Sequence, residues 1–298
     1  MAVSSPLKPA EVGAERVATP GLRPQRRFLG RRLSHHLILI LICCAFLVPF
    51  VVMITTAFKT PEDIFRTPPR LLPQEWVLSN FSAAMESMPF LRYLGNTLLL
   101  VVLNVAGTLV SCPLVGYGLA KLNWAGRGPV FATVLGTMML PAQVTFIPLY
   151  LIWDRAGAVG TFWPLIIPAF FGTPFYIFLL RQFFTGVPDS LREAGLLDGA
   201  SEFRIYLQIV LPQAKAAVAT VAIFQFVATW TDFLLPLIYL NSEERYTLSI
   251  GLYNFFGQHG VDWGPLMAAC LMFTIPALAI FIVAQRYFVQ GISVTGMK

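Results

Sequence analysis

Long stretches without a charged side chain dominate this 298-residue sequence and decide what it can fold into. Crossing about 30 Å of hydrocarbon takes roughly 20 helical residues, because each backbone amide needs a partner within its own helix. Five uncharged runs reach that length, and a sixth is interrupted only by Asp232; the six are 37–58, 93–120, 129–153, 156–180, 216–242 and 263–285. The sequence therefore predicts an all-α, polytopic membrane protein with six transmembrane helices.

The composition agrees with this prediction. With 56% hydrophobic and 12% charged residues and a mean hydropathy of +0.69, the chain has too little polar surface to cover a soluble globule of its size. The four cysteines lie inside apolar runs and have no spacing typical of a disulfide framework or a zinc site. We therefore expect no metal centre, and we interpret the cysteines as packing residues.

Basic residues indicate the orientation of the predicted spans. Seven of the 21 Lys and Arg residues precede the first run, so the net charge of +6 indicates topology rather than nucleic-acid binding. With a cytoplasmic N-terminus, 15 of the 21 fall on the cytoplasmic side, which predicts that both termini are cytoplasmic. Residues 1–36 are expected to form a disordered basic tail before a membrane domain at 37–298. The outer segments 59–92 and 241–262 fit either plain linkers or short surface helices that meet an extracytoplasmic partner.

A polar segment at about 186–212, on the predicted cytoplasmic side, reads as two short helices joined by a turn. Ser190 is placed to cap the first helix, with Glu193 reaching back to a free amide. Gly199 is expected to end that helix in a left-handed conformation, and Ser201 to cap the second. The alternative is an ordinary connecting loop, in which Glu193 serves its cap and Asp198 is simply solvated.

The segment resembles a known signature. Glu193-Ala194-Gly195, Gly199-Ala200 and Ile209 to Pro212 match the pattern Glu-Ala-Ala, Gly-Ala, Ile-x-Leu-Pro of the coupling loop in ABC importer permeases of the carbohydrate type. The resemblance covers about 37–298. The C-terminal stretch 285–291 is most similar to the second permease subunit of maltose-type importers. Other matching stretches are 58–60, 80–81, 96–97, 116–122, 139–150 and 230–237. Gly195, Ala216 and Thr231 depart from the family's usual alanine, proline and asparagine.

The resemblance implies a type I ABC importer permease in the plasma membrane of a bacterium or archaeon. It also implies a heterodimer with a second permease subunit, two cytoplasmic ABC ATPase subunits, and an extracytoplasmic solute-binding protein that delivers a sugar. No glycine is directly followed by lysine in this sequence, so the chain lacks the usual phosphate-binding loop. We therefore expect a non-catalytic subunit without a cofactor of its own, with ATP and Mg²⁺ held by the ATPase chains.

Two groups of residues are candidates for function. The resemblance assigns coupling to the ATPase to Leu191, Glu193, Ala194, Gly195, Asp198, Gly199 and Ala200. A carboxylate within a span usually faces a polar cavity or a partner, which predicts a substrate path at Gln225, Thr229, Trp230, Thr231 and Asp232, with Trp230 as a stacking face. Alternatively, Asp232 pairs across the helix bundle purely for assembly. The intramembrane amides of Asn96, Asn104 and Gln143 fit either role.

A rival function of another class is an ion-coupled secondary transporter. Such a protein needs paired ionisable residues inside its spans or a repeated architecture, and this sequence has one carboxylate there and no convincing internal repeat. A membrane-bound enzyme is disfavoured further, because the sequence contains no evident nucleophile and base pair and no metal cluster.

Overall fold

The computed structural model describes residues 26–256 and 261–295, and side chains within 35–256 and 261–285. The chain divides into two units, 1–50 and 51–298, which are described separately. The first unit holds most of helix α1 (Arg26–Ala57), which carries the first predicted span at His35–Ala57. Most of the predicted disordered tail lies outside the described residues. Its last part, 26–36, differs from the prediction because it continues helix α1.

The second unit consists of helices, with no strand among its described residues, which confirms the all-α prediction. By length and composition, α4 (Phe90–Lys121) and α15 (Trp263–Thr295, apolar over Trp263–Gln285) are each long enough to cross a membrane. A third candidate span, Trp163–Gly186, consists of α7 (Trp163–Phe170) and α8 (Pro174–Gly186). Together with α1 these make four candidate spans in the described part of the chain.

Two further candidate spans are pairs of helices that meet at a sharp bend. Helices α5 (Arg127–Thr137) and α6 (Ala142–Arg155) meet at 101°, and the break falls just before Pro141. The helical stretch Glu202–Gln213 meets α12 (Lys215–Trp230) at 82°. This stretch contains α10 (Glu202–Ile205), a π-helical turn (Tyr206–Val210) and α11 (Leu211–Gln213). The break falls at Ala214, two residues after Pro212. Counting each bent pair as one span gives the six that the sequence predicts.

Two predicted boundaries are wrong. The fourth span begins at Trp163 instead of Ala156, because Gly157 and Gly160 both have positive φ and form turns before it. The fifth helix ends at Trp230 instead of continuing to Ser242. Beyond it the chain breaks, and a short helix α13 (Leu234–Tyr239) follows. Asp232 therefore lies in the break after α12, and not near the middle of a helix as predicted.

Segments 59–92 and 241–262 contain short helices rather than plain linkers. These are α2 (Pro61–Ile64), α3 (Ser79–Glu86), the 3₁₀ turn η2 (Glu243–Arg245) and α14 (Leu248–Tyr253). Amide side chains attach both segments. Asn80 Nδ2 donates to the carbonyls of Ala57 and Lys59 at 3.0 and 2.8 Å, and Asn96 Nδ2 on α4 donates to those of Glu244 and Tyr246, both at 2.9 Å. The predicted amide at Asn96 thus serves structure.

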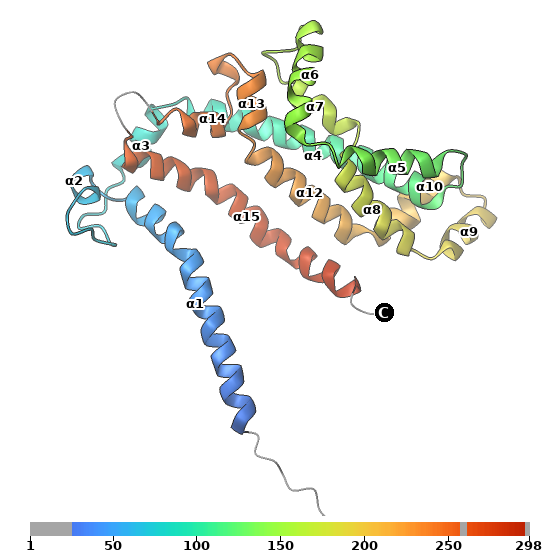
Figure 1. Cartoon of the computed structure of the whole chain (residues 1–298), viewed down its shortest axis with the longest axis horizontal. Coiled ribbons are helices and arrows are strands. Elements are labelled where there is room, and N and C mark those ends of the chain that lie inside the picture. The colour runs from blue at the N-terminus through green and yellow to red at the C-terminus, as the bar shows by residue number, and fades with distance from the viewer. Residues whose placement is uncertain (1–25, 257–260, 296–298) are drawn as a thin grey trace, which may run out of the picture. The chain divides into compact units, whose positions relative to one another are not determined.

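Helix α4 runs through both hydrophobic clusters of the second unit. At its C-terminal end, Tyr117 and Leu119 pack with α8, α12 and residues 205–210. At its N-terminal end, Tyr93 and Val101 pack with α12, α14 and α15. Helices α4, α8 and α12 lie side by side over much of their length (Figure 1). Helix α4 is therefore packed against other helices near both of its ends.

Candidate functional site

The polar segment 186–212, called the coupling segment below, folds as two short helices joined at a glycine. Helix α9 (Asp189–Leu197) ends at Gly199, whose φ of +77° is the left-handed conformation predicted for it. The Ala200 amide donates to the Gly195 carbonyl at 3.0 Å across this turn. Helix α10 then begins after Ser201, whose Oγ accepts from the Arg204 amide at 3.4 Å. The predicted turn and second cap are therefore both present.

The predicted capping box at the first helix is wrong. Helix α9 begins at Asp189, its cap residue is Pro188, and no side chain caps it. Ser190 lies inside the first turn, two residues after the cap position. Among the described residues, the exposed Glu193 carboxylate has no hydrogen-bond partner, so it is free for another chain.

Gly195 faces the interior of the coupling segment. A β-carbon at this position would lie 3.0 Å from Ile205 Cγ1 and 3.1 Å from Ile209 Cδ1. The glycine therefore lets α9 approach the following helix of its own chain, whereas the sequence suggested closer approach by a partner. Ala200 also packs inward, against the cluster that contains Ile205.

The outward face of the coupling segment is apolar as well as acidic. Leu191, Glu193, Ala194, Asp198 and Gly199 of the predicted coupling set are exposed. Three further apolar side chains were missed: Leu196, Leu197, which is 90% exposed, and Phe203, which is 61% exposed. The sequence could have indicated Leu197, because the 3.6-residue periodicity of a helix places it on the side opposite the inward-facing Gly195.

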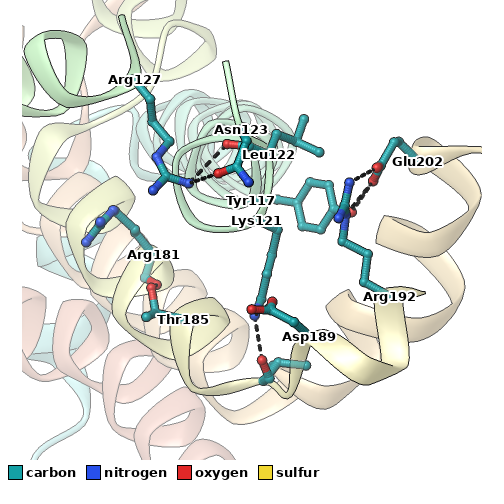
Figure 2. Close-up of polar contacts among 11 residues, drawn as sticks. Tyr117, Lys121, Leu122, Asn123, Arg127, Arg181, Thr185, Asp189, Arg192 and Glu202 are labelled. Carbon is teal, nitrogen blue, oxygen red and sulfur yellow. Dashed lines mark hydrogen bonds and ion pairs between the residues drawn. The ribbon is translucent and has the colours of Figure 1, made fainter. Parts of the chain in front are cut away.

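Two side chains of α4 hold the coupling segment, and both were outside the predicted site. The first is Lys121, the last residue of α4, whose side chain is only 3% exposed. Its Nζ donates to the Val187 carbonyl at 2.5 Å and to Asp189 Oδ1 at 2.6 Å (Figure 2). The hydrogen bond and charge of Lys121 hold the pKa of the Asp189 carboxyl below its usual range. This contribution to stability is present at neutral pH and is lost only as the pH falls through that lowered value.

The second contact is made one turn earlier on the same face of α4. The Tyr117 hydroxyl donates to Glu202 Oε2 at 2.8 Å, and Arg192 on α9 pairs with both oxygens of the same carboxylate (Figure 2). Glu202 thus joins α4, α9 and α10. The positive charge of Arg192 is stabilised by Glu202, which raises the pKa of the Arg192 guanidinium. We call Tyr117 and Lys121 the α4 anchor.

The α4 anchor links the coupling segment to a span that is not adjacent to it in sequence. Chain connectivity alone joins residues 186–212 to α8 and α12. The sequence signal for the anchor was a lysine four residues after a tyrosine at the end of an apolar run, which places both on one helix face. Their partners, 68 and 85 residues further along the chain, could not be identified from that spacing.

A cavity of about 400 Å³ lies between α4, α7, α8, α12 and α13. Its polar lining comes from Asn104, Thr173, Gln225, Thr229 and Asp232, and four prolines and several leucines and alanines supply the rest. Three of the five predicted substrate-path residues, Gln225, Thr229 and Asp232, therefore share one cavity. We call it the polar cavity.

The other two predicted substrate-path residues lie elsewhere. Trp230 is buried in the core, where its ring lies 5.6 Å from Phe226 and 5.4 Å from Phe273, and its Nε1 donates to the Phe273 carbonyl at 3.1 Å. Its ring cannot offer a stacking face to the cavity, which corrects that prediction. Thr231 is exposed and donates to the Val227 carbonyl at 2.8 Å, outside the cavity lining.

Comparisons with known proteins give the chain a family. Residues 113–294 match the family model described as "Binding-protein-dependent transport system inner membrane component". The chain is 31% identical over 277 residues to the probable ABC transporter permease protein YurM of Bacillus subtilis (strain 168), covering 93% of this chain and 92% of that protein. It is also 31% identical over 253 residues to the arabinooligosaccharides transport system permease protein AraQ of Halalkalibacterium halodurans, covering 84% of this chain and 90% of AraQ.

A solved structure has the same fold. The crystal structure of a bacterial ABC transporter involved in the import of the acidic polysaccharide alginate contains a chain that matches with a TM-score of 0.79. The match covers 91% of this chain and all of that chain at 22% sequence identity. The family match spans the coupling segment, the α4 anchor and most of the polar cavity, and the apolar helices fit a multi-pass membrane protein. The chain belongs to the family of inner-membrane components of binding-protein-dependent transport systems.

Proposed function

We propose that this chain is the permease subunit of an ATP-driven carbohydrate importer, and that it forms part of the translocation path. Its relatives include permeases named for arabinooligosaccharide and diacetylchitobiose uptake. Its partners are a second permease subunit, two ABC ATPase subunits and a solute-binding protein outside the membrane. The chain itself is non-catalytic and holds no cofactor; ATP and Mg²⁺ belong to the ATPase chains.

The observation that carries this proposal is the construction of the coupling segment. Helix α9 is short, closed by Gly199, tied to α4 through Lys121 and Glu202, and exposed along its outer face. The exposed Leu191, Glu193 and Leu197 then contact an ATPase subunit. When the ATPase subunits close, α9 moves as a unit, and the anchor moves α4 together with α8 and α12. This movement changes the side of the membrane to which the path opens.

Orientation follows from charge. The excess of Lys and Arg around the coupling segment and before the first span supports a cytoplasmic location for both termini and for residues 186–212. The short helices of segments 59–92 and 241–262 then lie on the outer side, where they meet the solute-binding protein. The membrane is the plasma membrane of a bacterium or archaeon.

Gly199 provides the test. Gly199→Pro is incompatible with the φ of +77°, because proline fixes φ near −65°, whereas Gly199→Asn retains a residue that tolerates the left-handed region. In the assembled importer, we expect the proline variant to insert and co-purify but to lose uptake and stimulated ATP hydrolysis, while the asparagine variant keeps both. Normal uptake by the proline variant would contradict the proposal. A purified chain that moves sugar without any ATPase would support an ion-coupled secondary transporter instead.

A further inference from the structure

The polar cavity presents hydrogen-bond acceptors, and each of its two side-chain amides uses one of its two N–H donors within the protein. Asn104 Nδ2 donates to the Leu100 carbonyl at 2.8 Å, and Gln225 Nε2 donates to Thr229 Oγ1 at 2.9 Å. These bonds leave the side-chain oxygens of Asn104 and Gln225 as acceptors in the lining. A ligand rich in hydroxyl groups, which both donate and accept hydrogen bonds, matches this wall.

Asp232 gives the same wall a negative charge. One carboxylate oxygen, Oδ1, accepts from the Leu235 amide at 3.2 Å. The lining contains no Lys, Arg or His, and no described side chain forms a salt bridge with this carboxylate. The carboxylate also accepts from the Leu234 amide, and its two oxygens keep further lone pairs that can accept from a ligand hydroxyl. In a cavity with mostly apolar walls, an unneutralised carboxylate strongly disfavours a second negative charge.

The rest of the lining suits the apolar faces of sugar rings. Pro164, Pro168, Pro174 and Pro236 contribute rigid apolar surface around the acceptors. The volume of about 400 Å³ falls within the range of about 300 to 1,000 Å³ that is typical of small-molecule sites. Sugar rings combine C–H faces with outward hydroxyl donors, so both parts of the lining find a counterpart.

We propose that the polar cavity contacts uncharged, hydroxyl-rich carbohydrates and that Asp232 is a specificity-determining residue, which rejects carbohydrates bearing carboxylate or phosphate groups. This inference rests on the proposed importer function and adds a substrate class to it. Asn104, Gln225 and Thr229 accept or exchange hydrogen bonds with the hydroxyls, and the charge of Asp232 sets the preference against anions.

The charge of the cavity is measured with thiol reagents of opposite sign. In the assembled importer with its four native cysteines replaced, Ala228→Cys places a thiol on the lining without removing a side-chain hydrogen bond. We expect cationic trimethylammonioethyl methanethiosulfonate to react about tenfold faster than anionic sulfonatoethyl methanethiosulfonate, after correction for their rates with a free thiol. Asp232→Asn keeps an oxygen for the Leu235 amide but removes the charge, so it should bring the ratio close to one.

A matched control and three outcomes decide this measurement. Glu244→Gln removes a carboxylate from an exposed outer turn that does not line the cavity, and it should leave the ratio unchanged. An equal or faster reaction of the anionic reagent would overturn the inference. So would a ratio that Asp232→Asn does not alter, or the absence of labelling by either reagent, because a contact site must be open to water.

Transport separates this inference from the proposal on which it rests. Proteoliposomes with the full importer receive two radiolabelled oligosaccharides of equal length, one neutral and one ending in a uronate, and uptake is expressed per sugar bound to the solute-binding protein. We expect the neutral sugar to be preferred and Asp232→Asn to raise the relative uptake of the uronate about tenfold. Unchanged selectivity in an active variant would sink the inference alone. Absence of ATP-dependent uptake of every sugar by the wild type would sink the importer function itself.

Discussion

Replacement of Lys121 by methionine tests whether α4 holds the coupling segment. Methionine fills a similar volume in the buried site but cannot donate to the Val187 carbonyl or to Asp189. A hydrogen bond from a charged group contributes about 1.5 to 3 kcal/mol. Losing the bond to Val187 should therefore favour detachment of the segment by about 10- to 150-fold, since each 1.4 kcal/mol is a factor of ten. The bond to exposed Asp189 adds less, because solvent screens it.

Hydrogen exchange measures this detachment directly. In the purified importer, amides of residues 190–203 should exchange about 10- to 150-fold faster in Lys121→Met, while those in the middle of α12 stay unchanged. Arg127→Met is the matched control, because Arg127 donates to the Leu122 carbonyl and Asn123 Oδ1 and touches no residue of the coupling segment (Figure 2). Asp189→Asn should have a much smaller effect than Lys121→Met.

The functional consequence is a change in coupling. Because the anchor transmits force to α4, Lys121→Met should lower sugar uptake more than ATP hydrolysis, so that more ATP is hydrolysed per sugar transported. Equal protection of residues 190–203 in the variant and the wild type would refute the reasoning. So would an unchanged ratio of ATP to sugar in an importer whose subunits still co-purify.

Three further predictions concern the same segment. Gly195→Val should push α9 away from Ile205 and Ile209, which should destabilise the segment by about 1 to 3 kcal/mol and lower uptake. Adding Ile209→Ala should make room for the valine and partly restore uptake. An additive loss in the double variant would contradict this packing. Ser201→Ala should destabilise α10 by about 0.5 to 2 kcal/mol, measured by hydrogen exchange, whereas Ser190→Ala should leave exchange unchanged. A larger effect of Ser190→Ala than of Ser201→Ala would indicate that Ser190 is the cap after all. Tyr117→Phe should weaken the attachment of Glu202 to α4 by about 1 kcal/mol. In a double-mutant cycle, the effects of Tyr117→Phe and Arg192→Met on stability should not be additive, because both residues bind the same carboxylate. Additive effects would argue against a shared carboxylate.

Span number and turn chemistry could be predicted because both depend on local sequence. The uncharged runs overlap the four candidate spans and the two bent helix pairs, and Gly199 and Ser201 have the left-handed turn and the cap that their residue types favour. The ends of the helices could not be predicted as well from the sequence. The absence of charge from 156 to 180 says nothing about the turns at Gly157 and Gly160, and apolar residues continue past Trp230 although the helix does not.

Contacts distant in sequence account for what was missed at the candidate site. Ser190 fits a capping box by spacing, but Asp189 pairs with Lys121 and the helix starts two residues earlier than a cap at Ser190 would place it. Trp230 looked like a cavity residue because it follows Thr229, yet neighbouring residues of a helix point about 100° apart, and its ring turns toward Phe273. Only the packing of α4, α12 and α15 decides which side chains reach the cavity and which enter the core.

Crosslinking from the outer face of α9 is the most direct test of the central claim, that this chain receives mechanical work from an ATPase it does not contain. The experiment compares two photoreactive side chains in membranes that hold the whole importer. One replaces the exposed Leu197, and the other replaces the exposed Tyr253 of segment 241–262. We predict that Leu197 crosslinks to an ATPase subunit, with a yield that changes on nucleotide binding, and that Tyr253 crosslinks to the solute-binding protein. A crosslink from Leu197 to the solute-binding protein, with none to an ATPase subunit, would contradict the account.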